Sequence, residues 1–221
     1  MKMESGDDHI NHGFETNFTV LKTSNFFAGD GFCAYDSKGK LAFRVDSYGP
    51  GAKNSTGEVV LMDADGRCLL TVRRKRPSLH HRWDGFTGER SEGQKPLFSV
   101  RKSSMLRQYC SATVEMYNKV GEEYQIVGSF AGRSCTVLGA DKKAVAEIRR
   151  KVDASSSVVL GKEVFWLSLK AGVDVAFVMG LVLILDQIQG DDEYHQFEAA
   201  GRRLDVDVDA TKENFRNIIS S

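Results

Sequence analysis

The chain has 221 residues, 41% of them hydrophobic, and its 30 basic and 30 acidic residues give a formal net charge of zero. This length suffices to bury a sizeable core, and the balanced charge gives no overall signal for nucleic-acid binding, which usually needs a strongly basic face. None of the four cysteines lies in a Cys-x-x-Cys pair, so we expect reduced thiols and no zinc site.

We expect residues 1–15 to be a disordered tail, because they are polar and contain no apolar run that would indicate a secretory signal. Lys2 at the second position excludes N-myristoylation, and the Ser-Ser ending excludes prenylation. These features predict a cytoplasmic protein that is not secreted, with the nucleus and the membrane surface as further locations.

From residue 16 onward, short runs of alternating apolar and polar residues recur about every ten residues, separated by turn residues. Asp36-Ser-Lys-Gly39 and Asp63-Ala-Asp-Gly66 each open with Asp and close with Gly, which indicates two hairpins. Strands at this density are typical of a sandwich or a barrel. The predicted strands are Phe18–Lys22, Gly31–Tyr35, Lys40–Ser47, Glu58–Met62, Arg67–Arg73, His81–Phe86, Pro96–Lys102, Ser111–Tyr117, Tyr124–Phe130, Ser134–Leu138, Val145–Lys151 and Val164–Lys170.

The segment Val173–Ile188 breaks this rhythm because it is almost continuously apolar. Between Val175 and Leu185 it carries no charged side chain, and Asp174 and Asp186 bound it. As a helix this stretch rises about 16 Å, well short of the roughly 30 Å core of a bilayer, so we expect no transmembrane span. Valine and isoleucine also favour strands, but the length and the Asp-bounded ends favour a helix.

A helix that is apolar on all sides must be covered on all sides. With about twelve strands to cover it, the sequence predicts an all-β fold with one central helix, a closed antiparallel β-barrel over residues 16–190. Closure also removes strand edges that would otherwise aggregate. We expect a monomer with a polar C-terminal extension over residues 191–221, which includes a candidate short helix at Asp192–Ala200.

No arrangement of residues in the sequence indicates catalysis. Neither a Gly-x-Ser-x-Gly elbow nor a glycine-rich phosphate loop occurs. His80 and His81 are adjacent, so on a strand they would face opposite sides and would not easily share a metal. We therefore expect no enzymatic activity, no metal and no cofactor.

The strongest chemical signal is a set of basic residues at the ends of three predicted strands. Such residues suit the phosphates of an anionic lipid headgroup or a nuclear import receptor, whereas the plainer interpretation is solvated charge that protects strand ends from aggregation. Whether the three groups meet at one rim depends on the fold. The candidate lipid-binding residues are Arg73, Arg74, Lys75, Arg76, Arg101, Lys102, Arg149, Arg150 and Lys151.

Several segments, in order and covering about residues 17–190, resemble the plant LURP-one-related family. Val158-Val-Leu-Gly-Lys-Glu-Val-Phe and the apolar Ala171–Ile188 look like its C-terminal signature. Similar segments precede them: Gly29-Asp-Gly-Phe, Asp36-Ser-Lys-Gly-Lys-Leu-Ala-Phe-Arg-Val45, Leu69-Leu-Thr-Val-Arg-Arg-Lys-Arg, Leu79-His-His-Arg-Trp83, Phe98-Ser-Val-Arg-Lys-Ser-Ser-Met105 and Gly128-Ser-Phe with Arg133-Ser-Cys135.

The resemblance implies a tubby-like fold, a barrel of about twelve strands around a hydrophobic helix. That architecture is similar to phospholipid scramblases and to the tubby C-terminal domain, a membrane-tethered transcription regulator that binds phosphoinositides. The resemblance also implies a link to plant defence and no established enzyme activity. His81 stands where an acidic residue would be expected before Arg82 and Trp83, and the cysteine cluster of the scramblases is missing, so no lipid contact is carried over from those proteins.

Two hypotheses about function follow. The first is a module that binds anionic membrane lipid, including phosphoinositide, reversibly through the basic strand ends. The second is a protein-interaction or structural protein in plant defence signalling, with an unknown protein partner and no lipid binding. The basic strand ends favour the first hypothesis, and the neutral overall charge and absent lipidation motifs favour the second.

Overall fold

The alternating runs of the sequence fold into antiparallel strands around an apolar helix. The structure, a computed structural model, describes residues 16–23, 31–46, 58–75, 82–102, 112–117, 121–153 and 157–189. The predicted tail over residues 1–15 and the predicted extension over residues 191–221 lie outside these ranges.

Within the described residues there are twelve strands, and each coincides with a predicted strand to within two residues at either end. They are β1 (Thr16–Thr23), β2 (Gly31–Tyr35), β3 (Leu41–Asp46), β4 (Glu58–Asp63), β5 (Cys68–Arg74), β6 (Trp83–Thr87), β7 (Phe98–Lys102), β8 (Ala112–Met116), β9 (Glu123–Ser129), β10 (Ser134–Leu138), β11 (Ala144–Arg150) and β12 (Val164–Leu169).

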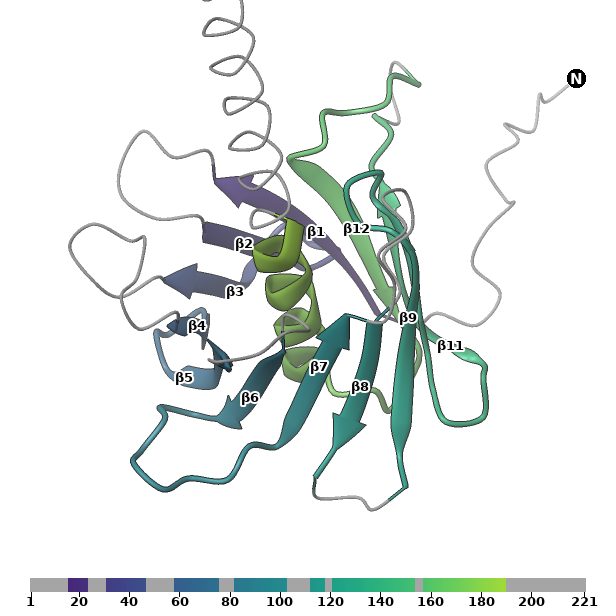
Figure 1. The fold of residues 1–221 in the computed structure, drawn as a ribbon. Coiled ribbons are helices and arrows are strands. Elements are labelled where there is room, and N and C mark those ends of the chain that lie inside the picture. The colour runs from purple at the N-terminus through teal and green to yellow at the C-terminus, as the bar shows by residue number, and fades with distance from the viewer. Residues whose placement is uncertain are drawn as a thin grey trace, which may run out of the picture. The chain divides into compact units, whose positions relative to one another are not determined.

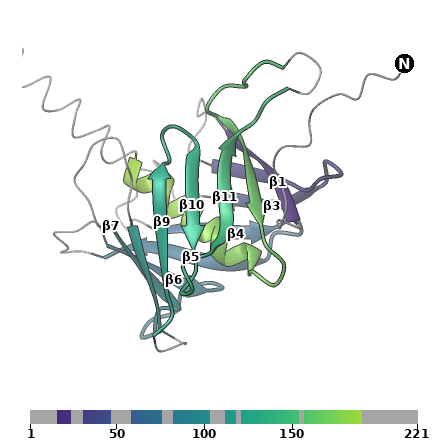
Figure 2. The same ribbon diagram turned by 90° about the vertical axis from the view of Figure 1, so that its right-hand side faces the viewer.

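Each strand pairs antiparallel with the next strand in the chain, and β1 pairs with β12, so the sheet closes into a barrel. In the closing pair Thr16 lies opposite Leu169 and Leu21 lies opposite Val164. Figure 1 shows this ring of strands, and Figure 2 shows β9, β10 and β11 side by side in its wall. The predicted closed antiparallel barrel is therefore confirmed.

Two hairpin turns form as their sequences predict. The Asp36 carboxylate accepts hydrogen bonds from the backbone N–H of Lys38 and of Lys40, both at 2.9 Å, and Gly39 has a φ of +75°. Asp63 and Gly66 repeat this arrangement in the turn between β4 and β5. Asp supplies the acceptor and Gly supplies the positive φ, so these turns fix the register of their strands.

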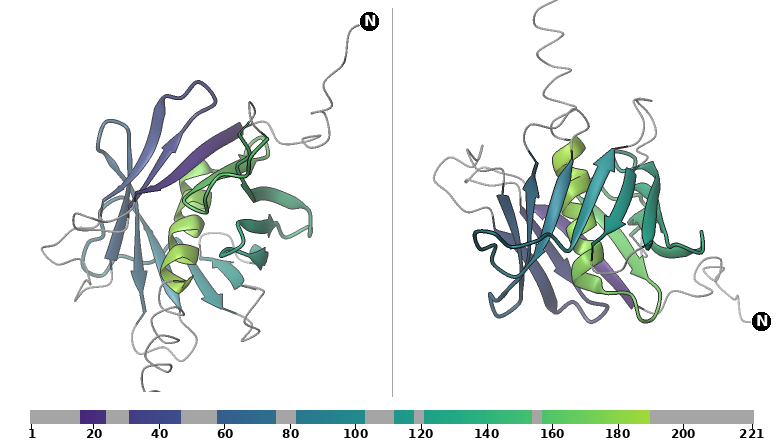
Figure 3. Two further views of the ribbon diagram at one scale, coloured as in Figure 1. Left: turned by 90° about the horizontal axis from the view of Figure 1, so that it is seen from above. Right: turned by 60° about the horizontal axis from the view of Figure 1, so that its bottom comes forward.

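The predicted helix spans residues 175–189. Residues up to Ile184 belong to the same compact unit as the strands, and residues from Leu185 onward belong to a second unit. Figure 3 shows the helix, up to Ile184, inside the ring of strands. Phe177 packs against the ring of Phe98 on β7, with centroids 5.0 Å apart, and against Tyr124 on β9 at 5.3 Å. These contacts fill the interior with side chains of the helix.

Candidate functional site

The three basic strand ends lie at the same end of the barrel. Because every neighbouring pair is antiparallel, all odd-numbered strands run in one direction and finish at one rim. The basic residues end β5, β7 and β11, all odd-numbered, and this is the upper rim in Figure 1. We call them the basic rim: Arg73, Arg74, Lys75, Arg101, Lys102, Arg149, Arg150 and Lys151. The candidate Arg76 lies outside the described residues.

Each basic strand end has one side chain on the inner face of the barrel and one on the outer face. On β5, Val72 is fully buried in the interior, and Arg74 follows it on the same face. Val100 and Lys102 stand in the same relation on β7. The inner members of the basic rim are Arg74, Lys102 and Arg150, and the outer members of the same strands are Arg73, Arg101 and Arg149.

The outer members pair with carboxylates at the barrel surface. Arg73 lies 3.7 Å from Glu58, and Arg101 lies 3.9 Å from Glu115. Arg149 pairs with Glu147 on its own strand. All three arginines are more than two-fifths exposed, and exposed pairs of this kind contribute about 0–1 kcal/mol. Such weak pairs leave the cations able to exchange a carboxylate for a phosphate.

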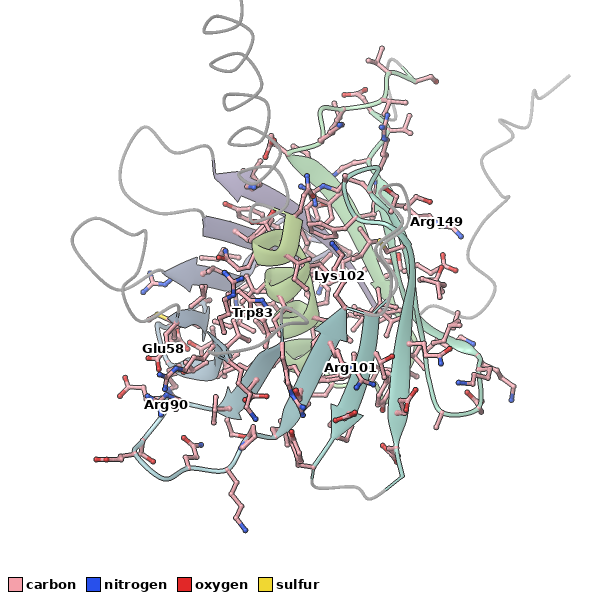
Figure 4. All side chains as sticks on the ribbon, viewed as in Figure 1. Glu58, Trp83, Arg90, Arg101, Lys102 and Arg149 are labelled. Atoms are coloured by element: carbon pink, nitrogen blue, oxygen red, sulfur yellow. The ribbon has the colours of Figure 1, made fainter. Side chains whose placement is uncertain are left out.

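The basic rim consists of two groups separated along the circumference. Only β6 lies between β5 and β7, so these two strand ends are about 10 Å apart. Three strands lie between β7 and β11, so the β11 group is about 19 Å further along the rim. Figure 4 shows Arg101 and Lys102 at β7 and Arg149 well apart from them. The fold therefore brings the β5 and β7 groups together and places the β11 group separately.

Trp83 on β6 lies between the inner members of the basic rim on β5 and β7. It lies directly opposite Arg74 on one side and opposite Val100, two residues before Lys102, on the other. Opposite residues in an antiparallel pair have Cβ atoms about 5 Å apart, and diagonal neighbours about 7–8 Å. The Trp83 side chain is 3% exposed, and its indole N–H finds no hydrogen-bond acceptor within the described residues. We call Arg74, Trp83 and Lys102 the mouth cluster.

The sequence analysis did not single out Trp83, because its role depends on which strands flank it. It also missed Arg82, which holds the outer surface of β6, β7 and β8 together. The Arg82 guanidinium donates to Ser99 Oγ and to the Tyr117 hydroxyl, both at 2.6 Å, and lies 3.3 Å from Glu115. Arg82 therefore serves the barrel wall and is not part of the candidate site.

Arg133, in the turn between β9 and β10, is a second structural arginine at this end of the barrel. Its guanidinium carbon lies 4.2 Å from the centre of the Phe130 ring and 4.5 Å from that of Phe165. Its Nε donates to the backbone carbonyl of Lys162 at 2.8 Å, and the residue is 4% exposed. A cation enclosed in this way stabilises the turn.

The opposite rim carries charges of both signs. Its hairpins contain carboxylates that bind backbone N–H groups, as Asp36, Asp63 and Asp141 do. Among the described residues of this rim, lysines and arginines alternate with these acids. They are Lys38, Lys40, Arg67, Arg90, Lys95, Lys142, Lys143 and Lys170, beside Asp36, Asp63, Asp65, Glu89, Glu92, Glu122, Glu123, Asp141 and Asp174.

Within the described ranges, no three His, Cys, Asp or Glu side chains gather in an arrangement that would hold a metal. His80 and His81 lie outside those ranges. No helix in the described part of the chain is long and apolar enough to cross a membrane. The described residues therefore present a charged rim as their clearest candidate site.

The described residues form a closed twelve-strand barrel around an apolar helix, which places the protein among the small β-barrel proteins. Comparisons with known proteins identify its family. A sequence model of the LURP-one-related family matches residues 16–186. The chain belongs to the LURP-one-related family, as its sequence segments indicated.

Relatives and a solved structure agree with this assignment. Protein LURP-one-related 5 of Arabidopsis thaliana is 62% identical over 188 residues, which cover 84% of this chain and 89% of that protein. Protein LURP-one-related 12 of the same plant is 61% identical, over 79% of this chain and 78% of that protein. An X-ray structure of an Arabidopsis thaliana protein matches with a TM-score of 0.56 and 23% identity, over 79% of this chain and 91% of that one. This last likeness concerns the fold.

Proposed function

We propose that this protein is a non-enzymatic, cytoplasmic module that docks reversibly on membranes containing anionic phospholipid, including phosphoinositide, through its basic rim. A role in plant defence is part of this proposal and derives from the family resemblance. The observation that carries the proposal is the position of three basic strand ends at one rim, while the other rim has mixed charge. Each basic residue near an anionic membrane surface contributes about 1 kcal/mol of attraction.

The mouth cluster supplies the contacts that would select a phosphorylated headgroup. Arg74 and Lys102 are cations on the inner face of the rim, and the Trp83 indole is an N–H donor that lacks an acceptor among the described residues. A phosphate oxygen that reached this N–H would accept a hydrogen bond from it, and a hydrogen bond to a charged group contributes about 1.5–3 kcal/mol. Charged groups together with a fixed neutral donor are the combination that distinguishes a phosphate ester from diffuse negative charge.

Co-sedimentation with vesicles tests the docking. The wild-type chain should bind phosphatidylcholine vesicles that contain phosphatidylserine or phosphatidylinositol bisphosphate, more weakly at physiological than at low salt, and should not bind phosphatidylcholine alone. The variant Lys75→Glu/Arg101→Glu/Arg150→Glu reverses three exposed charges of the basic rim. Its affinity should fall at least about a hundredfold, because about 3 kcal/mol of attraction is lost and repulsion is added.

The matched control is Lys38→Glu/Lys40→Glu/Lys142→Glu, which makes the same change in net charge at three exposed lysines of the opposite rim. Binding should change little in this variant. Equal losses in both variants would mean that net charge, and not the basic rim, drives association. Absence of wild-type binding to any anionic vesicle at low salt would overturn the proposal and favour a protein partner.

Trp83→Phe tests the mouth cluster, because it keeps an aromatic ring and removes the N–H. The variant should lose affinity for phosphatidylinositol bisphosphate vesicles by a larger factor than for phosphatidylserine vesicles. The ratio of the two affinities is an internal control, since partial unfolding would lower both together. An unchanged ratio of the two affinities would show that the Trp83 N–H does not contact the headgroup.

A further inference from the structure

The connection between β11 and β12 extends beyond the basic rim as a narrow hairpin. Val152 and Val159 form an isolated antiparallel bridge past the ends of both strands, and the Leu160 N–H donates to the Lys151 carbonyl at 2.9 Å. Nearer the tip, the Asp153 N–H donates to the Val158 carbonyl at 2.9 Å. Figure 1 shows this connection rising above the other strand ends. We call Val152, Val158 and Val159 the hairpin valines.

The hairpin valines are unusually exposed for aliphatic side chains. Val152 is 46% exposed, Val158 is 58% exposed and Val159 is 50% exposed. Val152 and Val159 share one face of the hairpin because they pair directly, and Val158 lies on the other face. Exposed valines therefore lie on both faces of the described legs of the hairpin.

Basic residues surround the base of this hairpin. Arg149, Arg150 and Lys151 lead into it from β11, and Lys162 leads out of it toward β12. Asp153 and the exposed Glu163 are the acidic residues among the described positions of this connection. An exposed apolar projection with cations at its base matches the gradient of a membrane surface, where anionic headgroups lie above the acyl chains.

Trp166 lies beside the basic residues at the base of this hairpin. It is 37% exposed on the outer face of β12, directly opposite Arg149. The Lys151 ammonium lies 4.9 Å from the centre of the Trp166 ring and donates to Thr19 Oγ1 at 2.8 Å. Tryptophan, with an apolar ring and a polar N–H, is enriched where membrane and water meet.

We infer that the described legs of the β11–β12 hairpin, residues 151–153 and 157–160, form a membrane anchor whose valines enter the acyl boundary of an anionic bilayer while Arg149, Arg150, Lys151 and Trp166 contact the headgroups. This inference rests on the proposed docking function and assigns the insertion to one segment of the rim. It also gives the β11 group a role separate from the mouth cluster, from which it is three strands away. The positive charge at the base of the hairpin favours a bilayer over a second copy of the chain, whose same surface would repel it.

The fluorescence of Trp166 tests the insertion directly, because the chain has two tryptophans and Trp83 is already buried. Adding phosphatidylcholine–phosphatidylserine vesicles to the wild-type chain should shift the emission to shorter wavelength. Vesicles made with lipid brominated near the headgroup end of the acyl chain should quench it. In Trp166→Phe both changes should disappear while vesicle binding persists at reduced strength.

The variant Val152→Ser/Val158→Ser/Val159→Ser should lose at least about tenfold in affinity for the same vesicles, because each 1.4 kcal/mol is a factor of ten and three valines lose apolar burial. Val127→Ser is the matched control, since Val127 is 39% exposed on β9 and away from the hairpin. Both variants should unfold at the wild-type temperature, because the valines contribute little to the core.

The outcomes separate the anchor from the docking function. If the wild-type chain binds anionic vesicles but Trp166 is not quenched and the triple serine variant binds equally well, the anchor is wrong and the docking function stands. If the wild-type chain binds no anionic vesicle, the docking function fails and the anchor fails with it. If the triple variant changes self-association and not vesicle affinity, the valines contact a second copy, and the anchor is again wrong.

Discussion

Gly85 on β6 lies directly opposite Phe98 on β7, and the ring of Phe98 occupies the space where a side chain of Gly85 would be. A Cβ atom on Gly85 would lie under 3.0 Å from three atoms of that ring. Phe98 is fully buried, and its ring in turn packs edge-on against Phe177 of the central helix. Because Gly85 has no side chain, the Phe98 ring fits between the backbone of β6 and Phe177 of the central helix.

The substitution Gly85→Ala should therefore destabilise the fold by about 1–3 kcal/mol, because the Phe98 ring cannot move without displacing Phe177. Urea denaturation of the two chains measures the difference. Gly161→Ala is the control, since a Cβ there meets nothing within 4 Å. Equal stability of the two alanine variants would contradict the packing described.

The N-terminus of the central helix should depend on Asp174. Its carboxylate accepts a hydrogen bond from the Phe177 N–H at 3.2 Å, which makes Asp174 the N-cap. Asp174→Ala should lower the free energy of unfolding by about 0.5–2 kcal/mol, whereas Asp174→Asn, which keeps an acceptor oxygen, should lose less. Thermal unfolding of the three chains measures this order. An alanine variant as stable as the wild type would show that Asp174 does not act as the N-cap.

Arg133 should be required for stability and not for lipid binding. Arg133→Lys keeps the charge but loses the planar group between Phe130 and Phe165 and the bond to the Lys162 carbonyl. We expect a loss of about 1–3 kcal/mol in the free energy of unfolding. Vesicle affinity of the folded variant should equal that of the wild type. A selective loss of vesicle binding without a loss of stability would instead place Arg133 in the lipid site.

Burial raises the pKa of the Cys68 thiol; the charge of Glu89 adds to the effect, and the hydrogen bonds to Thr71 and the Leu70 backbone oppose it. The native chain therefore keeps the Cys68 proton at a pH where the unfolded chain loses it. The stability contributed by this proton is complete below the unfolded pKa and is lost as the pH rises through the folded pKa. Alkylation by iodoacetamide, which needs the thiolate, should have its pH midpoint higher in the native chain than in urea.

Mass spectrometry of the peptide that contains Cys68 measures this midpoint without any mutation. The same peptide from the chain unfolded in urea is the reference. A native midpoint at or below the reference would show that burial does not govern this thiol.

Local chemistry predicted much of the fold. The Asp and Gly residues at either end of the two hairpin turns could be recognised because each residue acts on its own neighbours, as Asp63 and Gly66 do. The helix could be recognised because the apolar stretch is long for a strand and is bounded by Asp174 and Asp186. The predicted start of β6 at His81 lies outside the described residues, and the strand begins at Trp83.

The candidate site was predictable only in part. The basic strand ends are visible in the sequence, but their common rim follows from strand pairing around the whole ring, which no local pattern encodes. The mouth cluster depends on Trp83 lying between Arg74 and Val100, a relation across three strands. The exposure of the hairpin valines could not be predicted, because valine beside a strand normally faces a core, whereas the Val152–Val159 bridge lies past the ends of β11 and β12.

The pairing of β1 with β12 also has a consequence for synthesis. The strand that closes the barrel is made last, and the helix that fills it follows that strand in the chain. Until β12 is made, β1 to β11 form at most an open sheet with two free edges and no helix over its apolar face, a state in which folding is slow and chaperones bind. We expect the ring to close only when the helix is present to fill it, because an empty apolar interior would be exposed to water. Chains that terminate before residue 175 should therefore be recovered with chaperones or as aggregates, and not as a smaller barrel.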